Sequence, residues 1–309
     1  MAQVLPPILI AGPTASGKSQ LALRLAKHCN GLIINADALQ VYDCWQILTA
    51  RPTQRDLAAA PHVLYGHVGC RDNYSVGAWL RDIKTVLKDE ARRPIIIGGT
   101  GLYFTALTVG LADIPEIPAE IRHQGDALRK DQGVFGFIAQ LQQDDPETLE
   151  KIDQNNPMRL QRAWEVLRAT GRGLSAWQAN VSPAVLPASD CCKYVLNVDT
   201  PALDVHIATR FEDMFAAGAL DEVAAVLAAG WDESHPSARA IGAAELVAVL
   251  RGDMEQDAAI AAAKLATRQY AKRQRSWFRN RMPGWAPLEF TTDAQREIAF
   301  SKIIAQKNC

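Results

Sequence analysis

The fold of this chain is decided by the stretch Pro7-Ile8-Leu9-Ile10-Ala11-Gly12-Pro13-Thr14-Ala15-Ser16-Gly17-Lys18-Ser19. Its first five residues are typical of a buried strand, and the eight from Gly12 to Ser19 match the pattern G-x-x-x-x-G-K-S/T. A helix is predicted to follow, from about Gly17 to Cys29. A glycine-bearing turn between a strand and a helix lets backbone N–H groups converge on phosphate oxygens, and the helix N-terminus adds positive charge. The stretch therefore predicts a polyphosphate-binding loop in an α/β protein.

Short apolar runs and helical patterns continue to alternate outward from this stretch, as in a parallel sheet covered on both faces. Further strands are predicted at Leu32–Ala36, Pro94–Ile97 and Tyr194–Val198, with a helix around Val76–Ala91. From residue 116 to 189 the pattern is helical, and one helix there is predicted to begin at Pro157, capped by Asn156, and to stop at Gly171. We therefore predict a P-loop NTPase-like α/β core over 1–115 and 190–309, with an inserted all-helical domain over 116–189.

Composition narrows the class of protein. The chain has 309 residues, 33 Lys and Arg against 34 Asp and Glu, and 48% hydrophobic residues. This balance excludes a protein that binds nucleic acid through bulk charge, and it excludes an acidic disordered chain. No apolar run reaches the length of a membrane span, and Val4–Ala11 is too short for a signal peptide, so we expect a cytoplasmic protein without membrane contact. The cysteines lack zinc-ligand spacing, and no structural zinc is expected.

Individual side chains near the predicted loop suggest chemistry but leave alternatives open. Lys18 supplies a positive charge to a phosphate, and the Ser19 hydroxyl is suited to hold Mg²⁺. Asp37, after the second predicted strand, is compatible with a general base, a Mg²⁺ ligand acting through water, or a helix N-cap. Thr100, in Gly98-Gly99-Thr100-Gly101, is equally compatible with a substrate contact and with the cap of a plain strand-to-helix turn.

A basic stripe lies near the end of the chain. Arg268, Lys272, Arg275 and Arg279 follow helical spacing on one face, and no acidic residue lies between Arg268 and Arg281. On a nearly neutral protein such a face favours a site for a nucleic-acid backbone. Arg159, Gln161 and Arg162 in the insertion are equally compatible with a polyanion contact or an ordinary surface. Arg239 is compatible with a phosphate contact or with a carboxylate partner.

Taken together, these segments resemble the tRNA dimethylallyltransferase (tRNA isopentenyltransferase) family. The resemblance spans nearly the whole chain, in order, over Gly12–Ser19, Asn35–Tyr42, Thr49–Pro52, Gly98–Tyr103, Asn156–Ala163, Arg239–Gly242 and Thr267–Gln274. It implies transfer of a dimethylallyl group from dimethylallyl diphosphate to N6 of the adenosine 3′-adjacent to the anticodon, in tRNAs that read codons beginning with U. Mg²⁺ is the implied cofactor, and diphosphate is the implied product.

The resemblance also implies roles for particular residues. Asp37 is the implied base, with Thr100 and Lys18 also catalytic, Ser19 as the metal ligand, and Gly12–Ser19 with Arg239 holding the donor. The implied tRNA contacts are Asp37, Ala38, Leu39, Gln40, Thr100, Arg159, Leu160, Gln161, Arg162, Arg268, Lys272, Arg275 and Arg279. The implied partner is the tRNA anticodon stem-loop, and we expect a monomer.

Three other functions compete. A small-molecule phosphotransferase would use the loop for ATP and would leave the basic stripe without a purpose. A nucleotide-gated RNA-binding module would leave the placement of Asp37 and Thr100 unexplained. An enzyme that prenylates free adenine nucleotides would need neither the insertion nor the stripe. The tRNA transferase accounts for all of these features, and we adopt it as the hypothesis.

Overall fold

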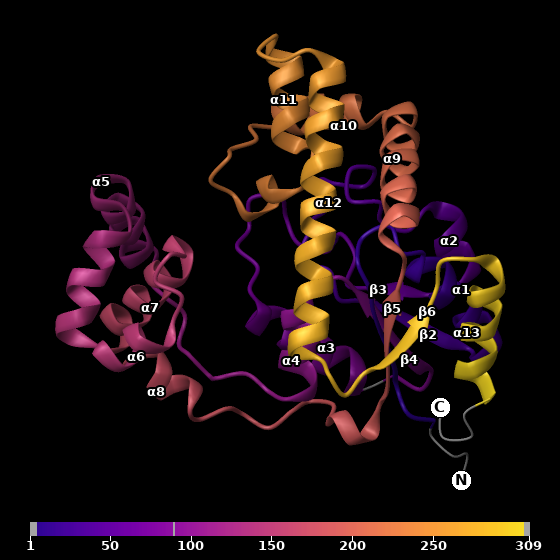
Figure 1. The fold of residues 1–309 in the computed structure, drawn as a ribbon, viewed down its shortest axis with the longest axis horizontal. Helices are drawn as coiled ribbons and strands as arrows, with labels where there is room; N and C mark the ends of the chain where they lie inside the picture. The colour runs from indigo at the N-terminus through magenta and orange to yellow at the C-terminus, as the bar shows by residue number, and fades with distance from the viewer. Residues whose placement is uncertain (1–4, 89, 306–309) are drawn as a thin grey trace. The chain divides into compact units, whose positions relative to one another are not determined.

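The computed structural model describes residues 5–88 and 90–305, and within these ranges six parallel strands form a single sheet (Figure 1). The order across the sheet is β3-β2-β4-β1-β5-β6. The strands are β1 (Ile8–Ala11), β2 (Gly31–Asn35), β3 (His62–Val63), β4 (Arg93–Gly98), β5 (Cys192–Asn197) and β6 (Ala286–Glu289). This arrangement confirms the predicted α/β class and the four strands expected from apolar runs.

The two strands at the edges of the sheet were not predicted from the sequence. β3 has two residues and β6 has four, and β6 contains Pro287. Edge strands need only one hydrogen-bonded neighbour, so they tolerate proline and carry little apolar signal. The central strands differ, because β1 is hydrogen-bonded on both sides, with Ile10 in register with Ile97 of β4 and Tyr194 of β5.

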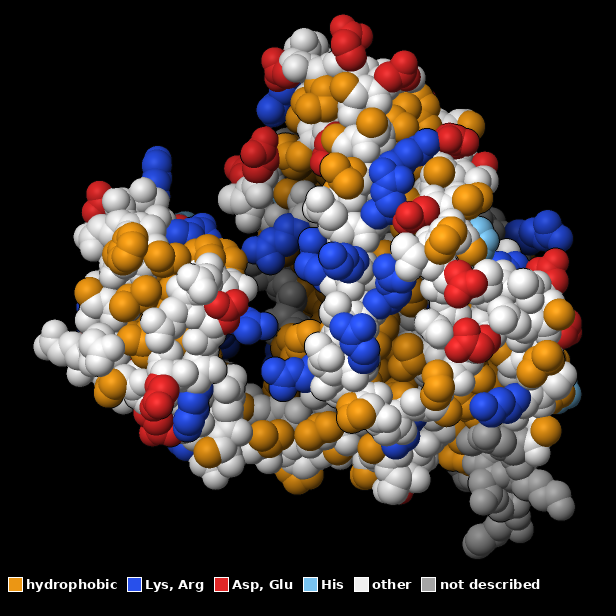
Figure 2. Space-filling model, in the orientation of Figure 1, with side chains coloured by type: hydrophobic (Ala, Val, Ile, Leu, Met, Phe, Trp, Pro, Cys, Tyr) orange, Lys and Arg blue, Asp and Glu red, His pale blue; other side chains and the backbone are white. Residues whose placement is uncertain are grey.

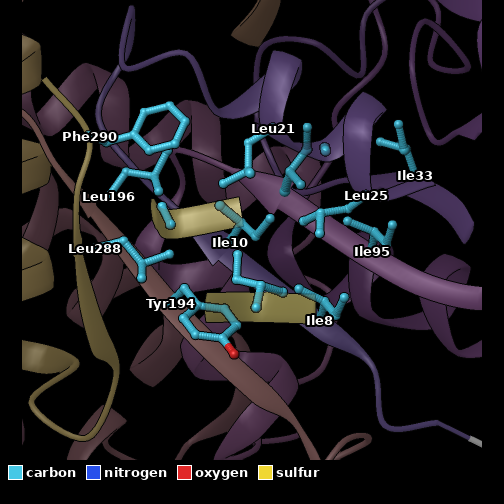
Figure 3. Close-up of a cluster of buried hydrophobic side chains, with 14 of the residues drawn as sticks. Ile8, Ile10, Leu21, Leu25, Ile33, Ile95, Tyr194, Leu196, Leu288 and Phe290 are labelled. Atoms are coloured by element: carbon cyan, nitrogen blue, oxygen red, sulfur yellow. The ribbon is translucent and has the colours of Figure 1, made fainter. Parts of the chain in front are cut away.

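Helices cover both faces of the sheet, as the buried strands require. One face packs against α1 (Lys18–Cys29), α9 (Thr200–Ala216) and α13 (Asp293–Ala305). Figure 3 shows this core, in which Ile8 and Ile10 of β1 lie among Leu21, Leu25 and Tyr194. The other face packs against α3 (Val76–Lys88), α4 (Gly101–Thr108) and the last turns of α12 (Gln256–Arg281). Because successive strand residues point to opposite faces, Leu9 belongs to this second core.

A third apolar cluster lies beyond the carboxyl ends of the strands. It joins the loop at Val41–Leu48 to α10 (Ala219–Ala228) and α11 (Ala243–Arg251). The Glu222 carboxylate of α10 accepts hydrogen bonds from the backbone N–H groups of Gln46, Ile47 and Leu48, at 2.7, 2.8 and 2.8 Å. These bonds fix the loop to the helix. The remaining short elements of this part are α2 (Gln54–Ala59) and the 3-10 turns η1 (Ala188–Asp190) and η2 (Pro236–Arg239).

The residues Val109–Ala184 form a separate compact unit, against the expected 116–189. Its helices are α5 (Ala119–Asp144), α6 (Pro146–Lys151), α7 (Pro157–Thr170) and α8 (Leu174–Gln178). The predicted start of α7 is confirmed, because the Asn156 side chain accepts bonds from the N–H groups of Met158 and Arg159. The chain enters and leaves this unit side by side, since Ser182 N donates to Leu111 O at 3.1 Å.

The described helices were also compared with the dimensions of a lipid bilayer. None of those within residues 5–88 and 90–305 combines the length and the apolar character that a membrane span needs.

Candidate active site

The predicted phosphate loop connects β1 to α1 at the carboxyl edge of the sheet. Gly17 has a φ of 84° and Ala15 a φ of 60°, so the loop turns through left-handed conformations before the helix begins. A Cβ atom at Gly12 would lie 2.9 Å from Ser16 Oγ and 3.2 Å from Leu196 Cβ, so only glycine fits there. The Ser16 hydroxyl is fully buried and has no hydrogen-bond partner among the residues that the structure describes. A loop of this shape, with an unsatisfied donor, is suited to an anion.

Two cations and one carboxylate meet beside this loop. Lys18 Nζ donates to Pro13 O at 3.3 Å. Burial lowers the pKa of Lys18 to about 8, while the Asp37 charge raises it and the Arg210 charge lowers it further. Burial also lowers the pKa of Arg210, which comes from α9 and was not predicted from the sequence. All three groups line one pocket, and together they carry one more positive than negative charge, which suits an anion.

Asp37 is held in a fixed position by its own backbone neighbourhood. Its N–H donates to Asn35 Oδ1 at 2.9 Å, and its Oδ1 accepts from Leu39 N at 3.0 Å. The second carboxylate oxygen lies near Gly99, 3.4 Å from the place of a Cβ atom there. No helix begins at Asp37, because the next helix is α2, so the structure removes the N-cap alternative.

Thr100 connects the end of β4 to the Asp37 segment. Its Oγ1 accepts a hydrogen bond from Ala38 N at 2.9 Å, and its own N–H donates to Ala36 O at 3.2 Å. A Cβ atom at Gly98 would lie 2.0 Å from Ala36 O, which explains the glycine at this crossing. The Thr100 hydroxyl is therefore held against the backbone of the Asp37 segment by hydrogen bonds between two strand ends.

The inner face of α12 closes the site. The Gln274 side chain accepts a bond from Thr14 N at 2.9 Å and donates one to Gly99 O at 3.0 Å. Burial raises the pKa of Tyr270, and the Asp37 charge raises it further, whereas hydrogen bonds with Thr100 and Gln274 lower it. Tyr270 therefore stays a neutral phenol at neutral pH. The sequence could have indicated Gln274, because it is a polar residue on the otherwise buried face of the basic helix.

A pocket of about 310 Å³ lies at this site, and its lining includes Tyr270 but neither Thr100 nor Gln274. The polar residues that line it include Ser19 and the charged residues Lys18, Asp37, Arg51, Asp56 and Arg210. Its apolar wall consists of Leu39, Leu48, Ile207, Phe211, Met214 and Ile241. A second pocket, of about 340 Å³, lies over the phosphate loop and shares Lys18, Ser19 and Arg210 with the first. The two pockets are therefore contiguous, with a cationic region next to an apolar one.

The outer face of α12 carries the predicted basic stripe. Arg268, Lys272 and Arg279 are exposed, and Arg275 Nη1 donates to Thr200 Oγ1 at 2.5 Å. Figure 2 shows Lys and Arg side chains following this helix. Lys272, Arg275 and Arg279 also border a cavity of about 660 Å³ beside the end of β5. The arrangement is a continuous cationic surface, suited to a polyanion.

The predicted site residues of the insertion differ in their exposure. Within the insertion, Leu160 is fully buried and Gln161 is buried with its amide bonded to Asp126 and Glu165. In this conformation both side chains take part in the packing of the unit, and their contacts with tRNA stay a prediction. Arg159 and Arg162 are exposed on the same helix.

Two further predicted residues, Arg239 and Gln40, differ in their relation to the pocket. Arg239 is exposed at the end of η2, and the member of its segment that lines the pocket is Ile241. Gln40 lines the pocket, but its amide donates to Thr49 O and Ala50 O at 2.9 and 3.0 Å. In this conformation the Gln40 amide therefore shapes the pocket wall.

The fold and the site define a P-loop-type protein that places a phosphate cradle beside an apolar pocket and a cationic helix. Residues 40–281 match the family model described as IPP transferase. The chain is 59% identical over 279 residues to a tRNA dimethylallyltransferase of Cereibacter sphaeroides, covering 90% of this chain and 87% of the relative. It is 56% identical over 286 residues to the tRNA dimethylallyltransferase of Dinoroseobacter shibae, covering 91% and 94%. The chain belongs to the IPP transferase family.

Solved structures agree with this assignment. The full-length tRNA isopentenylpyrophosphate transferase of Bacillus halodurans superposes with a TM-score of 0.68 at 30% identity, covering 98% of this chain and 96% of that chain. A eukaryotic dimethylallyltransferase acting on tRNA superposes with a TM-score of 0.82 at 26% identity, covering 96% and 77%. The predicted family is thereby confirmed, and with it the class of transferase.

Proposed function

We propose that this protein transfers a dimethylallyl group from dimethylallyl diphosphate to N6 of the adenosine 3′-adjacent to the anticodon, in tRNAs that read codons beginning with U. The observation that carries the proposal is the two-part pocket. Lys18, Ser19 and Arg210 offer positive charge and hydrogen bonds to a diphosphate, while the neighbouring wall is apolar. A Cβ atom at Gly242 would lie 3.1 Å from Leu48 and 3.3 Å from Phe211, so this wall is closely packed and suits a short branched hydrocarbon.

The chain supplies both halves of the reaction. The N6 lone pair forms a bond to C1 of the dimethylallyl group while the bond from C1 to the diphosphate oxygen breaks. Lys18, Arg210 and the loop amides stabilise the negative charge that collects on the departing diphosphate. The Asp37 carboxylate accepts the N6 proton as the new bond forms, and the Thr100 hydroxyl helps to position the reacting groups.

The residues beside the loop also fit Mg²⁺. The Ser19 hydroxyl and the Asp37 carboxylate are oxygen ligands of the kind this ion prefers, and they line the same pocket. Mg²⁺ usually takes one or two protein ligands together with substrate phosphates and water, so a sparse donor set is appropriate. When bound, Mg²⁺ supplies additional positive charge to the leaving diphosphate. We assign Ser19 as the residue that holds it.

The acceptor is proposed to be the anticodon stem-loop of tRNA. The outer face of α12 offers Arg268, Lys272, Arg275 and Arg279 to the RNA backbone. The target adenosine must leave its stack to reach the pocket, at a cost of a few kcal/mol. Arg159 and Arg162 are exposed on α7, and we assign them to contacts with the RNA loop. We further propose that the protein acts as a monomer in the cytoplasm.

The proposal is tested by incubating the protein with Mg²⁺, dimethylallyl diphosphate and an unmodified anticodon stem-loop with an adenosine 3′ of the anticodon. Mass spectrometry should show the RNA gaining one dimethylallyl group. A matched stem-loop with guanosine at that position is the control and should not gain mass. An unmodified adenosine RNA, together with phosphate transfer from ATP to a small acceptor, would instead favour the phosphotransferase.

A further inference from the structure

The Gln274 side chain is a buried polar group of α12 that bonds to two loops of the site. It is 4% exposed, and both ends of its amide are bonded: Oε1 to the N–H of Thr14, Nε2 to the carbonyl of Gly99. Thr14 belongs to the phosphate loop after β1, and Gly99 belongs to the turn after β4. One side chain of α12 therefore joins two loops that are separate in the sequence.

The turn after β4 is shaped to receive this helix. A Cβ atom at Gly99 would lie 2.1 Å from Gln274 Nε2, and one at Gly101 would lie 2.1 Å from Trp277 Cδ1. Two glycines thus let the turn approach the inner face of α12 at a distance that any side chain would prevent. The close contact leaves the Gln274 amide little freedom to rotate.

We propose that Gln274 is a positioning residue, which fixes the phosphate loop relative to the turn that carries Thr100. The proposal rests on the proposed function. The donor diphosphate is held by the loop containing Thr14, whereas Thr100 is bonded to Ala38 beside the Asp37 base. The Gln274 amide sets the separation between these two sides. A displacement of reacting groups by about 1 Å can reduce the rate ~100-fold, so loss of the two Gln274 hydrogen bonds should lower kcat.

The variant Gln274→Glu distinguishes the contributions of the two hydrogen bonds. The ionised carboxylate still accepts from Thr14 N but repels the Gly99 carbonyl. When protonated, the same group donates its O–H to Gly99 O and restores both bonds. Burial and the Asp37 charge raise the pKa of the introduced carboxyl group, while Lys18 and Arg210 lower it, and the neutral Tyr270 also faces it. The defect should therefore be large where the introduced group is ionised and should shrink where it is protonated.

The experiment measures kcat and KM of Gln274→Glu relative to the unaltered protein from pH 6 to pH 9. We expect kcat to fall at least about tenfold at pH 8, with the KM for RNA unchanged, and the ratio of the two kcat values to recover toward pH 6. Gln256→Glu, the same change at an exposed position in the first turn of α12, should match the unaltered protein throughout. A kcat ratio near one at pH 8 would overturn the positioning role.

Two further measurements keep the proposal testable. If Gln274→Glu does not fold, Gln274→Met removes both bonds without adding charge, and its kcat should be reduced equally at every pH; an unchanged kcat would overturn the role. If the unaltered protein does not modify RNA, the proposed function fails by itself. In that case, the binding of inorganic diphosphate, measured by calorimetry, tests the positioning role of Gln274. The affinity for diphosphate should be reduced in Gln274→Glu more at pH 8 than at pH 6. Affinities identical to those of the unaltered protein would contradict the positioning role.

Discussion

Lys18 contributes positive charge to the site but destabilises the folded state at neutral pH. Its ammonium group is held against Pro13 O, and burial lowers its pKa to about 8. At pH 7 the group is charged, so the folded protein carries a desolvated charge that the unfolded chain leaves in water. The folded state therefore binds this proton more weakly than the unfolded state. Its contribution to stability is unfavourable below pH 8 and improves as pH rises from 8 to the unfolded value near 10.5.

Replacement of this lysine should accordingly have opposite effects on stability and on binding. We expect Lys18→Met to raise the melting temperature of the ligand-free protein at pH 7 by a few degrees, because the buried charge is gone. Diphosphate should no longer raise the melting temperature of the variant. Calorimetric melting with and without diphosphate measures both effects. A lower melting temperature combined with retained stabilisation by diphosphate would contradict this account.

Asp37 carries the proposed proton transfer, and its surroundings allow a nearly isosteric test. In Asp37→Asn the side-chain oxygen can still accept from Leu39 N, so the local turn should persist. Loss of the base should reduce transfer ~10²–10⁴-fold while RNA affinity stays within about twofold. Single-turnover rates and filter binding provide the two measurements. Asp43→Asn, an exposed neighbour, is the matched control, and equal losses in rate and affinity would count against the base assignment.

The residues that sequence reasoning missed depend on long-range contacts. Lys18 and Asp37 follow predicted strands, so their meeting at one edge of the sheet could be expected from topology. Arg210 and Gln274 lie in helices whose position over the site depends on tertiary packing, and Gln274 bonds to Thr14 across 260 residues of sequence. Leu160 and Gln161 are buried in the packing of the insertion, and because a motif can serve packing as readily as binding, their contact with RNA stays a prediction.

At the scale of elements, α12 has two functions, and helical spacing places the residues for each function on a different face. Its inner face brings Tyr270 and Gln274 to the site, and its outer face is cationic. The stripe was predictable because charges at helical spacing need no tertiary information. The edge strands β3 and β6 were not, because their pairing is supplied by neighbours and not by their own apolar residues.

The outer face should control RNA affinity without altering the donor site. We expect Lys272→Gln combined with Arg279→Gln to weaken stem-loop binding, and to reduce the slope of log affinity against log salt by about one for each phosphate that the variant no longer neutralises. Binding of inorganic diphosphate should stay unchanged. The control removes two exposed charges elsewhere, in Lys84→Gln with Lys302→Gln. An unchanged salt slope in the first pair would remove α12 from the RNA interface.

At the scale of the whole molecule, the chain is a sheet-based core interrupted by a helical unit with its own apolar centre. Phe137, Leu160 and Trp164 are buried within that unit, among its own helices. The core resumes with Leu186 N donating to Leu107 O at 3.0 Å, so the two ends of the core flanking the insertion are already adjacent. The insertion is therefore attached through two neighbouring chain segments and interrupts no strand.

Excision of the insertion tests this division. Replacing residues 110–183 by a short glycine-serine linker should leave a folded core, because the flanking segments already meet. Such a core should bind inorganic diphosphate with the affinity of the full chain and lose most transfer to the stem-loop. Circular dichroism, calorimetry and the mass-spectrometric assay give these three results. Loss of diphosphate binding in a folded core would show that the insertion supports the phosphate loop.

The position of β1 at the centre of the sheet also bears on how the chain is made. β1 pairs with β4 on one side and with β5 on the other, and β5 begins at Cys192, after the whole insertion. During synthesis on the ribosome, β1 therefore lacks its second neighbouring strand, β5, at a stage when the helical unit is already able to fold. The phosphate loop is translated before the insertion, yet Gln274, which bonds to Thr14 of the loop, is translated 260 residues later. A nascent chain released before α12 would hold the loop without its partner.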